Sequence, residues 1–188
     1  SLQAECKDLF GETAGILYPP VSYVTTGTGE RWKEMHAQNF AQHGGEWECQ
    51  AQIQIFEGDG RMVVDQGCGL SVSGKHGSLT HYPFSLNCRA DVKYDADNTR
   101  FSYNFFEDRV LSQKEFSYYN SISLKNGGND YYWGDLRQDI RGTMLRNTIG
   151  LRLAREAGLL ASEQRIALVF LNGDFYNLTY LQANSNKK

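Results

Sequence analysis

The sequence predicts an α+β domain, in which one main helix packs on an antiparallel sheet. Three observations lead to this prediction: short alternating segments from Cys49 onward, one amphipathic segment after Asp135, and an Asn172-Gly173 pair between two apolar runs. The chain has 188 residues, of which 40% are hydrophobic and 13% aromatic. It is therefore long enough and apolar enough to fold around a core of its own.

The chain divides into three parts on its sequence pattern. Residues 1–48 form an amino-terminal extension with a short helix expected at about residues 31–42. Residues 49–182 form the main domain. Residues 183–188 are polar and are expected to be a frayed tail.

The sheet is predicted first from residues 50–56, where polar and apolar residues alternate with the period of a half-buried strand. A Gly-Asp-Gly break follows, and residues 61–65 resume the pattern as the second strand of a hairpin. Further short strands are expected at residues 69–73, 82–88, 100–105 and 120–124.

The main helix is predicted to begin at Asp135, whose carboxylate is suited to cap it, with a Gln three residues later in the manner of a capping box. Leu136, Ile140 and Met144 recur every four residues on one face, which is the spacing of an apolar stripe. Gly158 is suited to end the helix at the C′ position.

The carboxyl-terminal hairpin is predicted from Asn172-Gly173, the preferred pair for a type I′ turn. Residues 165–171 and 174–181 are its two strands. This register places Phe170 opposite Phe175 and Val169 opposite Tyr176, so that aromatic side chains meet across the strands.

Charge and hydropathy argue against two classes of partner. The net charge is −3, which gives no electrostatic reason to expect a nucleic acid. The longest apolar runs, such as residues 166–171, fall far short of the ~20 residues that span a bilayer. Residues 1–8 are polar and mixed in charge, so we do not expect them to belong to a signal peptide, and an export signal removed before Ser1 stays open.

The four cysteines follow no zinc-binding spacing. We interpret them as isolated buried thiols. A single disulfide between Cys68 and Cys88, on neighbouring strands, is the alternative. The four histidines, His36, His43, His76 and His81, likewise have no ligand pattern beside them, so no metal site is expected.

Residues 69–75 match the first seven positions of a phosphate-binding P-loop, G-x-x-x-x-G-K. His76 then stands where that loop needs Ser or Thr, and no helix is expected after Lys75. We therefore interpret the segment as a glycine-rich turn between strands. Such a turn still allows a phosphate to approach backbone amides closely.

Acidic residues gather near the predicted start of the main helix, at Asp130, Asp135 and Asp139. Carboxylates at this place complement the helix dipole and cap the helix, which is the better interpretation of Asp135. A helix carboxylate can also pair with a phosphate-binding cation, as in kinases. For Asp139 both interpretations stay open.

Five segments occur in an order that resembles the spore-coat-protein-H (CotH) kinase family. They are Gly69-Leu-Ser-Val-Ser-Gly-Lys-His-Gly-Ser78, Tyr82-Pro-Phe-Ser-Leu-Asn-Cys-Arg89, Leu124-Lys-Asn-Gly-Gly-Asn-Asp130, Leu136-Arg-Gln-Asp139 and Val169-Phe-Leu-Asn-Gly-Asp-Phe-Tyr176. The resemblance implies the amino-terminal portion of an atypical kinase-like fold. It also implies ATP and Mg²⁺ as cofactors, a protein substrate phosphorylated on Ser, and a bacterial protein that is extracellular, on the cell surface or in the spore coat.

Two departures from the family pattern affect the expected site. The lysine that family members usually carry before residues 84–89 is replaced here by His81-Tyr-Pro83. The family's catalytic aspartates are expected beyond the last residues of the chain, so no catalytic residue is assigned and the chain by itself is expected to be inactive. From the resemblance we expect Lys75 and Arg89 to neutralise phosphates and Asp139 to orient one of them.

The alternative prediction is a non-catalytic structural module that binds carbohydrate or protein. Aromatic residues bracket the Asn126-Gly-Gly128 turn and could form the contact surface; they are Tyr118, Tyr119, Tyr131, Tyr132 and Trp133. The competing interpretation is that most of them pack in the core, as aromatic side chains generally do.

Overall fold

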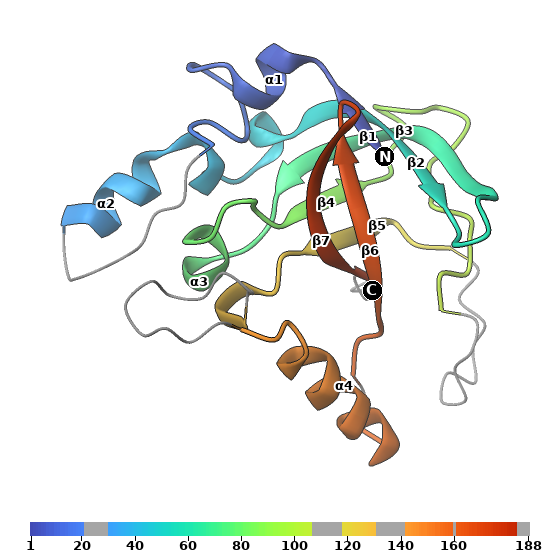
Figure 1. Ribbon diagram of the computed structural model, residues 1–188. Helices are drawn as coiled ribbons and strands as arrows, with labels where there is room; N and C mark the ends of the chain where they lie inside the picture. The colour runs from blue at the N-terminus through green and yellow to red at the C-terminus, as the bar shows by residue number, and fades with distance from the viewer. Residues whose placement is uncertain (21–29, 107–117, 131–141, 160, 184–188) are drawn as a thin grey trace.

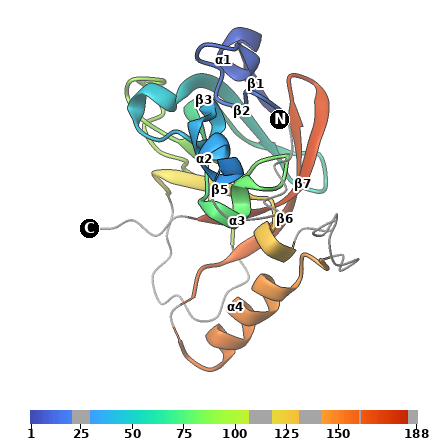
Figure 2. The same ribbon diagram turned by 90° about the vertical axis from the view of Figure 1, so that its left-hand side faces the viewer.

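The structure is a computed structural model, and it describes residues 1–20, 30–106, 118–130, 142–159 and 161–183. Within these residues, seven strands close into a barrel in the order β1-β2-β3-β4-β5-β7-β6 (Figures 1 and 2). The strands are β1 (Leu2–Ala4), β2 (Cys49–Phe56), β3 (Met62–Val72), β4 (Leu86–Arg89), β5 (Ser121–Lys125), β6 (Gln164–Leu171) and β7 (Asp174–Ala183).

The helices of the described residues are short and lie around the barrel (Figure 1). They are α1 (Cys6–Phe10), α2 (Glu30–Ala37), α3 (His76–Leu79) and α4 (Arg146–Glu156), with 3-10 turns η1 (Asn39–Ala41), η2 (Gly45–Trp47) and η3 (Gly128–Asp130). None of the helices in this part of the chain is long and apolar enough to cross a membrane.

The barrel closes between β1 and β6, the one parallel pair in it, where Leu2 lies opposite Leu171. All other neighbouring strands are antiparallel. Just past Leu171, the Asn172 side chain accepts a hydrogen bond from the Ala4 N–H and donates one to the Ala4 carbonyl, both at 2.9 Å. The side chain of the hairpin turn thus continues the pairing and helps to hold the barrel shut.

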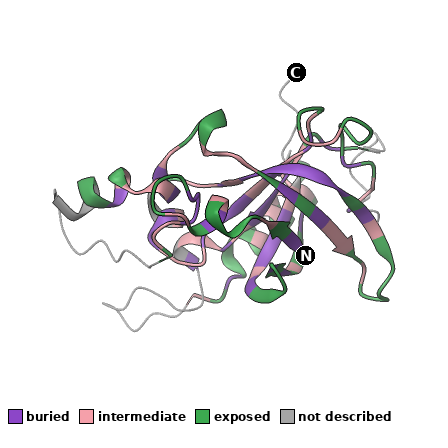
Figure 3. Cartoon of the chain, turned by 90° about the horizontal axis from the view of Figure 1, so that it is seen from above, coloured by how far each residue is buried: buried purple, intermediate pink, exposed green. Residues whose placement is uncertain are grey.

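The core fills the barrel because alternate residues of each strand point inward. In β2, Ala51 and Ile53 are buried whereas Gln50 and Gln52 are exposed. Figure 3 shows the same contrast for the described residues, with buried residues concentrated along the strands and many exposed ones on helices and turns. Phe84 is fully buried and stacks on Phe40 with ring centroids 4.3 Å apart, which ties the segment after α2 to the core.

The predicted α+β class, with a kinase-like sheet and one packed helix, is wrong, because the structure is a closed mixed β-barrel with few helices. The sequence pattern identified most strands but not their closure. Residues 61–65 and 69–73, predicted as two strands, belong to the single strand β3, and the strand predicted at 100–105 is wrong, since only an isolated bridge at Phe101 is present there. Closure depends on β1, a three-residue strand inside the expected amino-terminal extension, and on pairings between residues more than 160 positions apart. Local periodicity carries no information about such distant pairings.

The main helix does not continue through Met144 as predicted. Asp135 and residues 136–141 lie outside the described residues, and α4 begins only at Arg146. Met144 has φ +58°, a left-handed conformation that an α-helix cannot contain. The cap comes instead from Asp130, whose carboxylate accepts hydrogen bonds from the Thr143 N–H at 3.1 Å and the Arg146 N–H at 2.8 Å. No residue of α4 is buried, so this helix does not pack on the sheet (Figure 1).

Other local predictions are confirmed. The helix expected at 31–42 is present as α2 and η1, and Gly158 follows α4 with φ +77°. Asn172 and Gly173 have positive φ angles of 51° and 92°, as a type I′ turn requires. Phe170 lies opposite Phe175 as predicted, but a shift in register at the next position places Val169 opposite Asn177 rather than Tyr176.

The cysteines are all free thiols in the structure. Cys68 and Cys88 are fully buried on the inner face of β3 and β4, but Leu70 rather than Cys68 lies opposite Cys88. Cys49 is partly buried, and burial raises the pKa of its thiol to about 12. Cys6 is exposed, so the expectation of buried thiols holds for only part of the set.

Candidate functional site

Two polar sites lie along the β3–β4 pair. One lies just past the Val72–Leu86 end, and the other surrounds Arg89 at the Gly69–Arg89 end, with a lining that extends to Ser71 and Val72. The first, the lysine site, consists of Ser73, Gly74, Lys75, Lys125 and Asn126. The second, the Arg89 pocket, is a pocket of about 330 Å³. Its polar lining side chains are Gln42, His43, Trp47, Glu48, Ser71 and Arg89.

The lysine site begins with a tight turn at the end of β3. Gly74 has φ +132°, a backbone conformation that L side chains rarely adopt. A Cβ atom at Gly74 would lie 2.5 Å from the Cβ of Ser78, so the turn is also too compact for a larger residue. Lys75 follows with an exposed side chain, directly before the four-residue helix α3.

Asn126 joins this turn to the one that follows β5. Its side chain is fully buried, and its Oδ1 accepts hydrogen bonds from the Ser85 hydroxyl at 2.9 Å and the Gly128 N–H at 3.0 Å. Its Nδ2 lies within 3.3 Å of three backbone carbonyls, those of Ser78, His81 and Pro83. One amide therefore uses both of its ends to hold two turns together, which fixes the position of the site.

Lys125 is the last residue of β5 and lies between these two turns. It is partly buried, and its Nζ donates a hydrogen bond to the Ser73 hydroxyl at 3.0 Å. Within the described residues this ammonium has no carboxylate partner. Burial lowers the pKa of Lys125, because the charged form loses hydration that one neutral hydroxyl does not replace.

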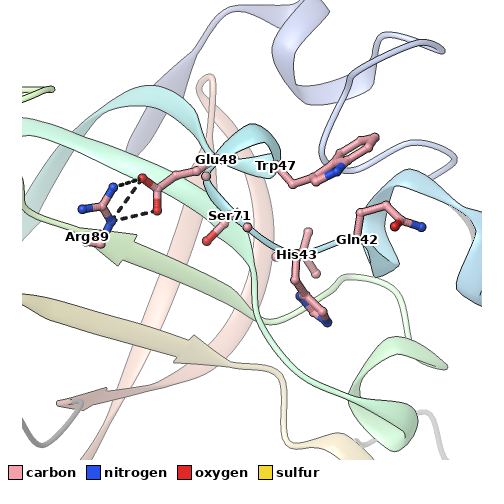
Figure 4. A pocket seen from close by; sticks show the side chains of 9 residues that line it. Gln42, His43, Trp47, Glu48, Ser71 and Arg89 are labelled. Carbon is pink, nitrogen blue, oxygen red and sulfur yellow. Dashed lines mark hydrogen bonds and ion pairs between the residues drawn. The ribbon is translucent and has the colours of Figure 1, made fainter. Parts of the chain in front are cut away.

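The Arg89 pocket differs because its cation is paired (Figure 4). The Arg89 guanidinium donates from Nε and Nη2 to the Glu48 carboxylate, with Nη2 2.5 Å from Oε1. Its Nη1 donates to Asp91. The Tyr94 hydroxyl adds a hydrogen bond to Glu48 at 2.6 Å. The guanidinium thus faces two carboxylates, and its charge is already neutralised within the protein.

The electrostatics of this cluster follow from the same contacts. Burial by itself raises the pKa of Glu48, but hydrogen bonds from Arg89 and Tyr94 outweigh it, and the pKa lies below its usual range. The hydrogen bond to Glu48 raises the pKa of Arg89. Both groups are therefore ionised throughout the neutral pH range.

Loop residues cover the outer face of β3 and set the position of Glu48. A Cβ atom at Gly69 would lie 2.3 Å from the Glu48 carboxylate and 2.4 Å from the Tyr94 ring. A Cβ atom at Gly67 would lie 2.5 Å from the Tyr94 carbonyl. Packing therefore explains why glycines stand in the middle of this strand, because Glu48 and Tyr94 occupy the space into which larger side chains would project.

The structure does not bring the predicted phosphate-binding residues together. Lys75 lies three residues past Val72, whereas Arg89 lies opposite Gly69, so along the strands they are up to about 20 Å apart. Arg89 is bound by Glu48 and Asp91, while Lys75 is exposed at the lysine site. Asp139, the third predicted residue, lies outside the described residues.

Sequence reasoning missed Lys125 and Glu48. Lys125 was visible as a cation at the end of a predicted strand, directly before Asn126-Gly-Gly128, inside one of the segments that resemble the CotH family. Glu48 carried no local signal, because its partner Arg89 is 41 positions away. Only the pairing of β2 with β3 and of β3 with β4 brings these two residues together.

The other predicted features give weaker evidence of a functional site. Tyr119 is buried and Tyr118 partly exposed, while Tyr131, Tyr132 and Trp133 lie outside the described residues. Among the residues that the structure describes, no group of three or more His, Cys, Asp or Glu could hold a metal ion.

Compared with protein-family models, with curated proteins and with solved structures, the chain gives no match.

Proposed function

We propose that this chain binds the phosphate groups of ATP at the lysine site, as part of a protein that phosphorylates serine. The observation that supports it is the partly buried Lys125 ammonium, whose one hydrogen bond within the described residues goes to the Ser73 hydroxyl. A buried cation without a counter-charge is unfavourable. A phosphate oxygen supplies a negative charge and accepts the ammonium protons for which the described residues provide no acceptor.

The residues around Lys125 fit a phosphate chain. Gly74 gives the turn beside Ser73 its positive φ of +132°, and the Ser78 side chain fills the space beside the Gly74 Cα. Lys75 is exposed two residues after Ser73 and can add a second positive charge. When bound, ATP supplies the phosphoryl group for transfer; the role of Lys125 and Lys75 is to neutralise and position its phosphates.

Magnesium fits these residues less well. Asp130 is the acidic residue of the turn after β5, but its two carboxylate oxygens accept hydrogen bonds from backbone N–H groups at the start of α4. Its Oδ1 also lies 3.6 Å from the Arg146 guanidinium. Asp130 therefore stabilises the start of α4, and we assign no magnesium ligand and no step that depends on one.

The resemblance to the CotH family supplies the finer part of the proposal. It predicts transfer of phosphate to Ser in a coat or surface protein, and a location outside the cell or in the spore coat. These stay predictions. The kinase-like fold that the resemblance also implied is not part of the proposal.

Titration calorimetry with ATP, in the presence and absence of Mg²⁺, tests the proposal. Lys125→Met should weaken binding by about 10- to 100-fold, the loss expected for a charge-assisted hydrogen bond. Lys75→Met should have a smaller effect, because the Lys75 side chain is exposed. Lys7→Met is the matched control, since it removes the same charge from an exposed position on α1. Equal affinity of the wild type, the Lys125 variant and the Lys7 variant would contradict the proposal.

A further inference from the structure

The Arg89 pocket has the features of a ligand site of its own, separate from the lysine site. Its volume of about 330 Å³ lies at the lower end of the range for small-molecule sites. In Figure 4, Arg89 and Glu48 lie on one side, Trp47 and His43 lie on the other, and Ser71 lies between them. We propose that this pocket binds a neutral, polyhydroxylated ligand, namely a sugar residue of a glycan.

The charges of the pocket disfavour an anion. Arg89 is held by Glu48 and Asp91, and the Glu48 side chain is only 9% exposed. A phosphate or carboxylate that approached Arg89 would meet two negative charges already placed around the guanidinium. Lys93, the next cation, is directed to the Tyr94 hydroxyl at 3.1 Å. The chemistry that suits the lysine site is therefore unfavourable here.

The hydrogen-bonding groups of the pocket match hydroxyl groups. Arg89 uses three of its five N–H donors on Glu48 and Asp91, so one N–H on each terminal nitrogen is left to donate. The Ser71 hydroxyl makes no hydrogen bond within the described residues, and it can both donate and accept. The Glu48 carboxylate adds an acceptor. Fixed donors and acceptors side by side suit a sugar, whose hydroxyls do both.

The rigidity of these groups adds to the match. Arg89 is held through three nitrogen atoms, and Glu48 is held by Tyr94 as well. A ligand therefore meets donors already fixed in position, which lowers the entropy cost of binding. The partly exposed Trp47 adds a large, rigid ring against which the C–H face of a sugar can pack.

The test is a titration of the full chain with glucose, galactose, mannose and N-acetylglucosamine, each as monosaccharide and trisaccharide, followed by calorimetry and tryptophan fluorescence. We expect at least one neutral saccharide to bind with a dissociation constant in the millimolar range or tighter. Glucuronate should bind less tightly than glucose, because its carboxylate meets Glu48 and Asp91.

Variants distinguish this pocket from other surfaces. Arg89→Lys should weaken saccharide binding by about tenfold, and Ser71→Ala and Trp47→Phe by about threefold or more. Ser102→Ala, an exposed serine elsewhere, is the matched control and should bind like the wild type. Ser71→Ala and Trp47→Phe keep the proposal testable even if Arg89→Lys fails to fold. Three outcomes would overturn it: no saturable binding of any saccharide, equal affinity of the Ser71 and Trp47 variants and the wild type, or tighter binding of glucuronate than of glucose.

Discussion

A partly covered cation lies near each end of the β3–β4 pair, Lys125 at one end and Arg89 at the other. The two cations differ in whether a carboxylate neutralises their charge within the described residues. At one end, Lys125 contacts a neutral hydroxyl, and burial lowers its pKa. At the other end, Arg89 is bound by two carboxylates, and its pKa is raised. An unpaired cation suits an anionic ligand, whereas a paired one provides fixed donors to a neutral ligand. The presence of a basic residue in a site is therefore less informative than its partners.

The largest effect is expected at Asn126, which positions the lysine site and does not line the Arg89 pocket. Asn126→Ala removes every hydrogen bond that its buried amide makes to the two turns of the lysine site. Unsatisfied buried groups should lower the free energy of unfolding by about 2–4 kcal/mol. Thermal and urea denaturation measure this loss.

The control for this change is Asn98→Ala, an exposed asparagine bound to Asp95. Asn98→Ala should lower the free energy of unfolding by less than about 1 kcal/mol. If both variants lost the same stability, Asn126 would not have the positioning role described for it. Saccharide binding at the Arg89 pocket should persist in Asn126→Ala below its melting temperature.

An intermediate effect is expected when the pairing of Arg89 is broken. Glu48→Gln should lower stability by about 1–2 kcal/mol at pH 7, because Arg89 then keeps only Asp91 as a charged partner. The Glu48 pKa is lowered in the folded state, so its contribution is complete above the carboxyl's ordinary pKa and is lost as the pH falls through the folded-state value. Urea denaturation of the wild type and Glu48→Gln between pH 7 and pH 3 should show that their difference in the free energy of unfolding disappears at low pH. A difference that stayed constant with pH would mean that charge is not its cause.

The smallest effect is expected at Lys125 and has the opposite sign. Without ligand, Lys125→Met should raise stability at pH 7 by roughly 1 kcal/mol, because it removes a partly buried cation that has no carboxylate partner within the described residues. The lysine pKa is lower in the folded state than in the unfolded one, so wild-type stability rises with pH between those two values. The difference in the free energy of unfolding between the wild type and Lys125→Met should therefore become smaller as the pH rises toward 10. Loss of stability in Lys125→Met at pH 7 would show that the ammonium is adequately paired.

The sequence was a good guide to local structure. The alternation in β2 and β3, the Asn172-Gly173 turn and the glycine after α4 all depend on neighbouring residues, and each is confirmed. The interruption of the helix before Arg146 was not predicted, because the carboxylate that binds its first N–H group belongs to Asp130, 16 positions earlier in the chain. The register at Val169 was missed for a similar reason, since an irregularity in pairing leaves no mark in a period-two pattern.

The closure of the barrel and the character of the two sites were beyond a single sequence. Leu2 and Leu171 meet only because five other strands lie between them. Arg89 has the type of side chain that binds phosphate, but the sequence did not reveal that Glu48 already neutralises its charge. Lys125 was overlooked because a lysine at a strand end is usually exposed, and its burial depends on the turn that Asn126 holds in place.

We propose that Lys125, which contacts a hydroxyl, binds phosphate, whereas Arg89, which contacts two carboxylates, does not. The most direct measurement is amide and indole chemical-shift mapping of the ¹⁵N-labelled chain during titration with ATP. We expect saturable shifts at Gly74, Lys125 and Asn126, with the Trp47 indole and Gly45 amide unchanged. Shifts that saturate at Trp47 and Gly45 while Gly74 and Lys125 stay unchanged would contradict it.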